Sequence, residues 1–212
     1  MKSRGLVLDV ARQRGGAMPS TVTLTDHSRW KNDGAMTNVM WEQLPSGVWV
    51  MSFNGASSVV TITNKPIINF TKQLTLMAWV KSTVAARQPV VYKSWTAGVV
   101  PYGLELLNGL RSTTPATWNT LGLSTSNRWQ FICGTFDSSL VANNAKSYSD
   151  GVLTGWVTSA VDLGTNTGNM QLGYWAGFYY TGYMAFVRAL TVPLTPPAIR
   201  SIYSRERRLF GV

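Results

Sequence analysis

The side chains that most often perform catalysis are scarce in this chain and poorly spaced for it. Its 212 residues include nine carboxylates, one histidine and one cysteine. Glycoside hydrolysis needs two carboxylates about 5–9 Å apart, yet no two acids here stand two or four residues apart, as neighbours on one face of a strand or helix would. His27 lies in a polar loop with no Ser–His–Asp order around it, and Cys133 lies in an apolar run typical of a small buried residue. We therefore expect no enzyme activity.

Glu105 is the one carboxylate in the middle of an apolar strand pattern, YGLELL (102–107). A carboxylate in that setting is either buried and paired with a cation or exposed on the concave face of a sheet, and the sequence leaves both interpretations open. The chain also lacks zinc-ligand spacing, a phosphate-binding loop and a dinucleotide fingerprint. The sequence therefore predicts no cofactor.

Three loop regions, 93–102, 113–120 and 174–183, are unusually rich in aromatic residues. Exposed rings of this kind can stack on sugar rings, while Asn, Asp and Gly-rich loops bind the hydroxyl groups. The alternative is that the rings pack the ends of the fold or a subunit contact. The residues predicted to bind a glycan or a partner are Trp95, Tyr102, Trp118, Trp175, Phe178 and Tyr179.

Positive charge is concentrated at the two ends of the chain. Residues 1–31 and 200–212 together hold ten basic and three acidic side chains, out of a net charge of +10. This asymmetry predicts contact with an acidic partner, which we expect to be a protein surface rather than nucleic acid, although the arginines could also only solvate two exposed ends. The predicted basic patch consists of Lys2, Arg4, Arg12, Arg14, Arg200, Arg205, Arg207 and Arg208.

The elements that must position these residues are mostly strands. A dozen short alternating runs, separated by turn signals such as NGAS and SDG, predict an all-β antiparallel sandwich in a single domain over residues 1–212. Trp79 and Trp129 lie in the most apolar runs, and we expect both to fill the layer between the sheets. LTPPAIRSIYSRERRLF near the end predicts one helix of about three turns. No apolar run is long enough for a membrane span or a signal peptide, so we expect synthesis in the cytoplasm.

The order of several motifs resembles the laminin-G-like, concanavalin A-like lectin/glucanase superfamily. The motifs are GLVLDV (5–10), TDHSRWKNDG (25–34), LPSGVWVMSFNGASSVVTI (44–62), LTLMAWVKS (74–82), NRWQFICGTFD (127–137), YSDGVLTG (148–155) and the run from LGYWAGFYY to RSIY (172–203). The resemblance implies a jelly roll of two curved antiparallel sheets, with the first and last strands close together. The two basic ends would then form one patch.

The same resemblance implies a possible weak calcium site at Asp26, Asp33 and Asn54. Two departures weaken it, since Arg29 replaces a loop glycine of the family and Ala185 matches a position that is acidic in the family. Calcium needs several oxygen ligands, usually including carboxylates. The alternative is that Asp26 caps a turn through hydrogen bonds to nearby backbone groups.

Two functions fit these features. The first is a non-catalytic structural or assembly protein on a virion surface, such as a phage capsid-decorating or tail protein, which docks on the capsid or on like subunits through its basic patch. This role would reconcile a lectin-like fold with synthesis in the cytoplasm. The alternative is an extracellular carbohydrate-binding module that recognises glycans through its aromatic loops.

Overall fold

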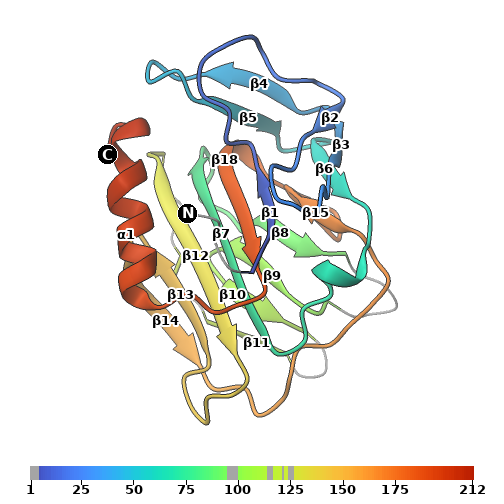
Figure 1. Ribbon diagram of the computed structural model, residues 1–212, viewed down its shortest axis with the longest axis vertical. Coiled ribbons are helices and arrows are strands. Elements are labelled where there is room, and N and C mark those ends of the chain that lie inside the picture. Colours follow the sequence, from blue (N-terminus) through green and yellow to red (C-terminus); the bar gives the residue numbers. More distant parts are fainter. Residues whose placement is uncertain (1–4, 95–99, 114–116, 121, 124–126) are drawn as a thin grey trace.

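Two antiparallel sheets stack face to face in the computed structural model, which describes residues 5–94, 100–113, 117–120, 122–123 and 127–212 (Figure 1). The first sheet has the spatial order β14 (Val152–Val157), β13 (Ala145–Ser149), β12 (Gln130–Asp137), β7 (Gln73–Ser82), β18 (Thr181–Leu190), β5 (Trp49–Asn54) and β4 (Met40–Gln43), with β1 (Leu6–Val10) also pairing with β18. The second has the order β11 (Trp118–Asn119), β10 (Gly109–Ser112), β9 (Gly103–Leu106), β8 (Gln88–Lys93), β15 (Met170–Leu172), β6 (Val59–Ile62), β3 (Gly34–Thr37) and β2 (Thr23–Leu24). The predicted two-sheet sandwich is confirmed.

The shorter elements complete the chain. A small hairpin pairs β16 (Tyr174–Trp175) with β17 (Phe178–Tyr179). The helix α1 spans Pro196–Glu206, and the 3-10 turn η2 (Arg207–Leu209) follows it directly. A second 3-10 turn, η1 (Pro66–Ile68), lies between β6 and β7. The predicted helix of three turns is confirmed. Two prolines occupy its first turn, where backbone N–H groups have no partner within the helix, so the N–H that proline lacks costs no hydrogen bond. No described helix is long and apolar enough to cross a membrane.

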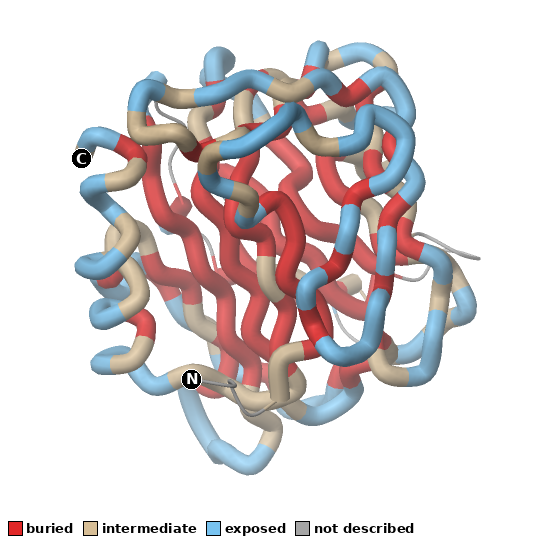
Figure 2. Tube along the Cα trace, turned by 45° about the horizontal axis from the view of Figure 1, so that its top comes forward, coloured by how far each residue is buried: buried red, intermediate tan, exposed pale blue. Residues whose placement is uncertain are grey.

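The main core lies between the sheets, as expected from period-two burial. In β6 the inward residues Val60 and Ile62 are buried, while Val59 and Thr61 on the other side are half-buried. Leu76 and Ile132 of the first sheet and Leu104 of the second belong to the same buried cluster. Figure 2 shows the central strands buried and the connecting loops exposed.

The first sheet is buried on both faces, because α1 and η2 cover its outer face (Figure 1). Trp79 is fully buried there and stacks on Phe210, with ring centroids 4.2 Å apart, and Trp129 lies 4.9 Å from the same phenylalanine ring. The expectation that Trp79 and Trp129 pack as core residues holds, but their predicted place between the sheets was wrong. They lie beneath the C-terminal segment instead.

A polar network ties the two ends of the chain to this covered face. The Glu206 carboxylate accepts a hydrogen bond from Trp79 Nε1 at 2.8 Å and pairs with Arg188 Nη1 at 2.9 Å. Arg188 also lies 3.2 Å from Asp9 of β1, and Asp9 pairs with Arg12 at 2.6 Å. Because β1 pairs with β18, the expected closeness of the first and last strands is confirmed.

Strand prediction failed where burial is weak or a turn was misread. The strands β3 and β4 went unpredicted because each leaves alternate or most residues exposed, without an apolar run. The run TLGLS (120–124) alternates like a strand in the sequence, but Thr120, Gly122 and Leu123, its described residues, lie outside any strand. Cys133 is fully buried as expected, and burial raises the pKa of its thiol.

Lys93 is an unusual member of the interior. Its side chain is fully buried on the inward face of β8, and Nζ donates a hydrogen bond to Asn64 Oδ1. Burial lowers the pKa of Lys93 to about 8. The folded chain therefore binds the Lys93 proton less tightly than the unfolded chain, and stability should rise with pH between about 8 and 10.5.

Replacing Lys93 with Met should stabilise the protein at pH 7 by about 1–3 kcal/mol, because a methionine fills similar space without burying a charge. The gain should shrink as the pH rises from about 8 and disappear above about 10.5, where the wild-type lysine is neutral in both the folded and the unfolded chain. Urea denaturation at several pH values measures this, with the exposed Lys72→Met as the matched control. A loss of stability at pH 7 in Lys93→Met alone would contradict the assignment.

Candidate functional site

The hairpin β16–β17 lies against the outer face of the second sheet, beside β8. Its two central residues, Ala176 and Gly177, both have positive φ, at 47° and 89°. Two-residue hairpin turns of this kind match the right-handed twist of the flanking strands. The turn holds Trp175 and Phe178 opposite each other, with their rings stacked at 5.8 Å.

Aromatic rings and arginines form a layered cluster between this hairpin and the sheet. The Tyr92 ring lies flat over Gly103, where a Cβ atom would come within 2.4 Å of it. Trp175 stacks on Tyr92 at 5.2 Å, and the Arg87 guanidinium lies 4.1 Å from the Trp175 ring centroid. The hairpin cluster, as we call it, consists of Arg87, Tyr92, Glu105, Asn108, Arg111, Trp175 and Phe178.

Glu105 anchors the hairpin cluster from below. Its carboxylate is fully buried, and both of its oxygens lie 2.8 Å from Arg87 Nε. It also accepts hydrogen bonds from the Tyr92 hydroxyl and the Asn108 amide, and Arg111 Nη1 lies 3.4 Å away. Of the two interpretations left open by the sequence, the buried and paired one is therefore correct.

The electrostatics of the hairpin cluster follow from this pairing. Burial lowers the pKa of Arg87, but its hydrogen bonds to Glu105 and the charge of that carboxylate outweigh burial and raise it overall. Burial, followed by the charge of Glu105, holds the pKa of Tyr92 well above its usual value. Arg87 is thus a fixed cation, about a quarter exposed, at the rim of the cluster.

The predicted ligand-binding aromatics divide into three groups. Phe178 is 46% exposed, and Trp175 and Tyr179 are half-buried beside it. Tyr102 and Trp118 belong instead to the core between the sheets, and the Tyr102 hydroxyl donates a hydrogen bond to the Ile68 carbonyl. Those two rings are inaccessible to a sugar, because Trp118 in β11 and Tyr102, directly before β9, are buried in the core between the sheets. Trp95 lies outside the described residues.

A polar row continues from the hairpin cluster across the outer face of the second sheet. Strand register places Tyr92, Gln171, Thr61 and Ala35 side by side in neighbouring strands. Gln171 and Thr61 are half-buried and Ala35 is exposed. This face therefore offers amide and hydroxyl groups beside Tyr92, on which Trp175 of the hairpin stacks.

The residues suggested for calcium do not fit a cation site. Asp26 is fully buried, and its two carboxylate oxygens accept hydrogen bonds from the backbone N–H groups of Asp9, Ser28 and Asn32. These contacts confirm the alternative, a turn capped by Asp26. Lys31 Nζ lies 3.3 Å from the Asp26 carbonyl oxygen, which adds a competing positive charge.

The other two suggested ligands are also engaged. Asp33 Oδ1 accepts the Asp26 N–H at 2.7 Å. Asn54 is the last residue of β5, and its Oδ1 accepts three backbone N–H groups of the turn that follows. Within the described ranges, no three His, Cys, Asp or Glu side chains are grouped so that they could hold a metal.

The predicted basic residues lie in two places. Arg200, Arg205, Arg207 and Arg208 are exposed on α1 and η2, and within the described residues none of them forms an ion pair with an Asp or Glu side chain. Arg207 Nε donates a hydrogen bond to the Val212 oxygen at 2.8 Å. Arg12 is engaged by Asp9, whereas Arg14 Nε donates a hydrogen bond to the Ser46 carbonyl. Ser46 Oγ donates in turn to the Leu209 carbonyl, so Ser46 contacts both Arg14 and the C-terminal turn η2. Lys2 and Arg4 lie outside the described residues.

Sequence reasoning missed Arg87 and Arg111. The signal for Arg111 was present, because the Asn108-Gly109 dipeptide between two apolar runs marks a hairpin and brings the two strands that carry Glu105 and Arg111 together. Arg87 precedes β8 in a stretch with no periodicity, and only the fold brings it to Glu105.

Replacing Glu105 with Gln should destabilise the fold by about 2–3 kcal/mol, because two largely buried arginines lose their counter-charge while the shape is kept. Chemical denaturation measures the free energy of unfolding, and Asp162→Asn, at an exposed position, is the matched control. A change in Glu105→Gln no larger than in the control would show that the hairpin cluster does not depend on this carboxylate.

Comparison with known proteins supports the same fold. The family profile described as "Concanavalin A-like lectin/glucanases superfamily" matches residues 54–200. No curated protein sequence matches the chain. Among solved structures, domain 4 of AbnA, a GH43 extracellular arabinanase from Geobacillus stearothermophilus in complex with arabinotriose, is similar with a TM-score of 0.71 and 14% identity, over 93% of this chain and 100% of that one.

Two larger proteins contain a similar domain. Trypanosoma rangeli sialidase matches with a TM-score of 0.69 and 15% identity, over 97% of this chain and 33% of the sialidase chain. The receptor-binding domain of botulinum neurotoxin D matches with a TM-score of 0.68 and 10% identity, over 95% of this chain and 53% of that one. At these identities the likeness establishes a lectin-like fold. Together with the family match over most of its length, it shows that this chain belongs to the concanavalin A-like lectin/glucanase superfamily.

Proposed function

We propose that this chain is a non-catalytic recognition module that binds glycans at the hairpin cluster. The observation that carries the proposal is the exposed Phe178 ring, which is stacked on Trp175 next to the Arg87 cation. An exposed ring can cover the apolar face of a sugar while neighbouring polar groups bind its hydroxyls. The similar arabinanase domain is described as bound to arabinotriose, which adds support from a relative of the same fold.

The rigidity of the hairpin cluster favours binding. Arg87 is held by Glu105 from one side and by the Trp175 ring from the other, so its remaining N–H groups keep a fixed direction. A group that is already ordered loses little conformational entropy when a ligand arrives. Gln171 and Thr61, in the adjacent polar row, extend the surface that hydroxyl groups could contact.

The arrangement of carboxylates argues against hydrolysis at this place. The Glu105 carboxylate is fully buried, and its oxygens are engaged by arginine, tyrosine and asparagine groups. Glycosidases need a pair of carboxylates on either side of the scissile bond, one of them free to transfer a proton. We therefore assign recognition rather than catalysis.

The test is a glycan array followed by titration of the best hit against Phe178→Ala. The matched control is Trp156→Ala, which removes a 56% exposed aromatic ring from the other sheet. Loss of a stacking ring should weaken binding by about tenfold or more in Phe178→Ala and leave Trp156→Ala close to wild type. Equal binding by both variants, or loss in the control alone, would contradict the proposed site.

A second candidate function is docking on an acidic capsid surface, as expected for a virion component. The observation that favours it is the outward face of α1, where Arg200 and Arg205 are exposed, with Arg208 exposed on the turn that follows. Exposed charges of one sign attract an acidic surface and are screened by salt.

Charge reversal tests this second candidate. The triple variant Arg200→Glu, Arg205→Glu, Arg208→Glu should no longer sediment with particles from the source culture. The wild-type chain should sediment with them at about 0.05 M salt and release at about 0.5 M. Phe178→Ala serves as the control that keeps the charges. Sedimentation that is indifferent to salt and to the triple variant would exclude docking by the basic helix face.

A further inference from the structure

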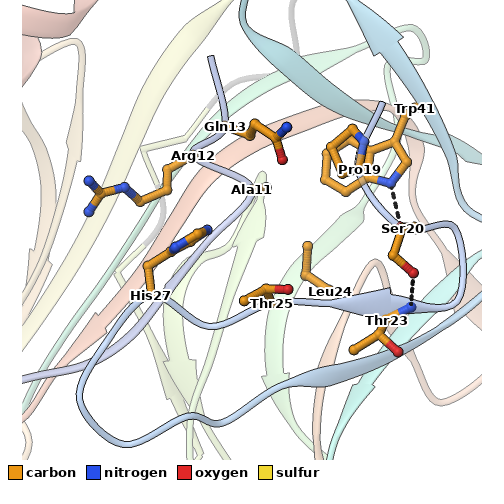
Figure 3. A pocket seen from close by; sticks show the side chains of 10 residues that line it. All are labelled: Ala11, Arg12, Gln13, Pro19, Ser20, Thr23, Leu24, Thr25, His27 and Trp41. Carbon is orange, nitrogen blue, oxygen red and sulfur yellow. Dashed lines mark hydrogen bonds between the residues drawn. The ribbon is translucent and has the colours of Figure 1, made fainter. Parts of the chain in front are cut away.

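A small pocket lies at the N-terminal end of the chain, between the segment after β1, the β2 region and β4 (Figure 3). Its volume is about 90 Å³. Figure 3 shows Pro19 and Trp41 on one side, while the Arg12 guanidinium points away from the pocket. Arg12 is also paired with Asp9 at 2.6 Å, so this pocket offers no free arginine to a ligand.

A larger groove follows the outward side of α1. The groove has a volume of about 360 Å³, which lies within the range of about 300–1,000 Å³ for ligand pockets. Its lining residues are all exposed, and they are Pro196, Pro197, Arg200, Ser201 and Ser204. Because proline has no backbone N–H, the positive charge of the groove comes from the Arg200 side chain rather than from donors at the first two positions of the helix.

An exposed apolar strip lies on β14, the edge strand of the first sheet next to α1. Leu153 is 42% exposed and Trp156 is 56% exposed. The register shifts by one residue at Thr154, so Leu153 and Trp156 lie on the same face although they are three positions apart. Leu153 lies opposite Tyr148, which belongs to the buried cluster beneath α1, so this face is the outer one. Trp156 lies opposite Lys146, which adds a second cation.

The apolar strip continues the groove. A Cβ atom at Gly151, the residue before β14, would lie 3.2 Å from Arg200 Cα. Figure 1 shows β14 running alongside α1 toward the end at which the helix begins. Leu153 and then Trp156 follow Gly151 in this direction, so the strip extends the groove toward the first turn of the helix and past it. Together the groove and the strip form what we call the α1–β14 groove.

The positive charge around the α1–β14 groove is not neutralised by nearby acids. Along the described chain, Arg200, Arg205 and Arg208 form no ion pair with an Asp or Glu side chain. Asp150, in the turn before β14, is already paired with Arg128 at 2.7 Å. A second copy of this chain would bring like charges together across a two-fold axis, so the complementary occupant is an acidic partner.

We propose that the α1–β14 groove docks a segment of a partner protein that carries both carboxylates and a large apolar side chain. A carboxylate of the segment lies at Arg200, where the Ser201 and Ser204 hydroxyls are further donors. The apolar side chain packs on Leu153 and Trp156, and tryptophan and arginine are the residues that most often carry the binding energy of protein interfaces. The proposal rests on the second candidate function only for the sign of the partner's charge, and it uses no residue of the hairpin cluster.

Titration with three synthetic peptides of about twelve residues tests the chemistry of the partner. The first peptide alternates Asp and Glu with Leu and Phe, the second replaces its acids with Asn and Gln, and the third replaces its apolar residues with Ser. The first should bind at least about fivefold more tightly than either of the others, because the groove uses both charge and apolar contact. Equal binding of the second or the third peptide, or of a thymidine oligonucleotide, would overturn the proposal.

Variants locate the binding. Arg200→Gln and Trp156→Ala should each weaken the first peptide at least about fivefold, and both residues are exposed, so the fold should survive. The matched controls Arg29→Gln and Trp30→Ala, at exposed positions of the N-terminal loop, should stay within about twofold. Arg205→Gln, on the same helix but outside the groove lining, should weaken binding less than Arg200→Gln. Equal loss in those two arginine variants, or unchanged affinity in Trp156→Ala, would overturn the proposal.

The same measurements separate this proposal from the docking of the chain on a capsid. Peptide binding that is lost in Arg200→Gln and Trp156→Ala supports the α1–β14 groove even where the chain does not sediment with particles, a result that excludes only the capsid as partner. Salt-sensitive sedimentation without binding of the first peptide would support the capsid role and overturn the groove.

Discussion

The Glu206 carboxylate holds the C-terminal helix and turn over one of the two outer faces of this sandwich. It accepts the Trp79 indole N–H and pairs with Arg188, while Phe210, four residues further along, stacks on the Trp79 ring. These contacts hold α1 and η2 over the centre of the first sheet. The strands beneath can therefore be apolar on both sides, which explains why β7 is buried along nearly its whole length. The rest of the architecture depends on this closure, because it removes the apolar outer face of the first sheet from water.

The outer face of the second sheet is also covered around a buried carboxylate, but only in part. There Glu105 binds Arg87 and approaches Arg111, and Tyr92 and Trp175 stack above the sheet. A short hairpin covers only part of this face, so Phe178 and a polar row remain accessible. Two of the nine carboxylates in the chain thus hold the coverings of the two sheets.

The fold was largely predictable from the sequence, because alternation of apolar residues fixes strands wherever one side is buried. It was harder to predict on which face of its sheet a given side chain lies. β7 and β12 are apolar on both sides, so period two could not tell that Trp79 and Trp129 face the helix rather than the other sheet. Tyr102 was wrongly predicted to be accessible for a related reason. Its position next to a loop suggested exposure, and only the pairing of the strands shows that the ring is buried.

The candidate sites were only partly predictable. Phe178 and Trp175, which the aromatic composition of their loop suggested as ligand contacts, lie at the surface of the second sheet, where Phe178 is 46% exposed. Arg87 and Glu105, which give the hairpin cluster its charge, are distant in sequence from the aromatic hairpin at 174–179. Contacts of that kind depend on which strands become neighbours, and residue spacing carries no information about it.

Amide hydrogen exchange of a Glu206→Ala variant tests the central claim most directly. If Glu206 closes the first sheet independently of the second, exchange should accelerate in residues 196–212 and in the middle of β7 and β12. The hairpin 174–179 and strands β8 to β10 should keep their wild-type protection. Protection that is unchanged over 196–212, or lost equally from both sheets, would contradict the account.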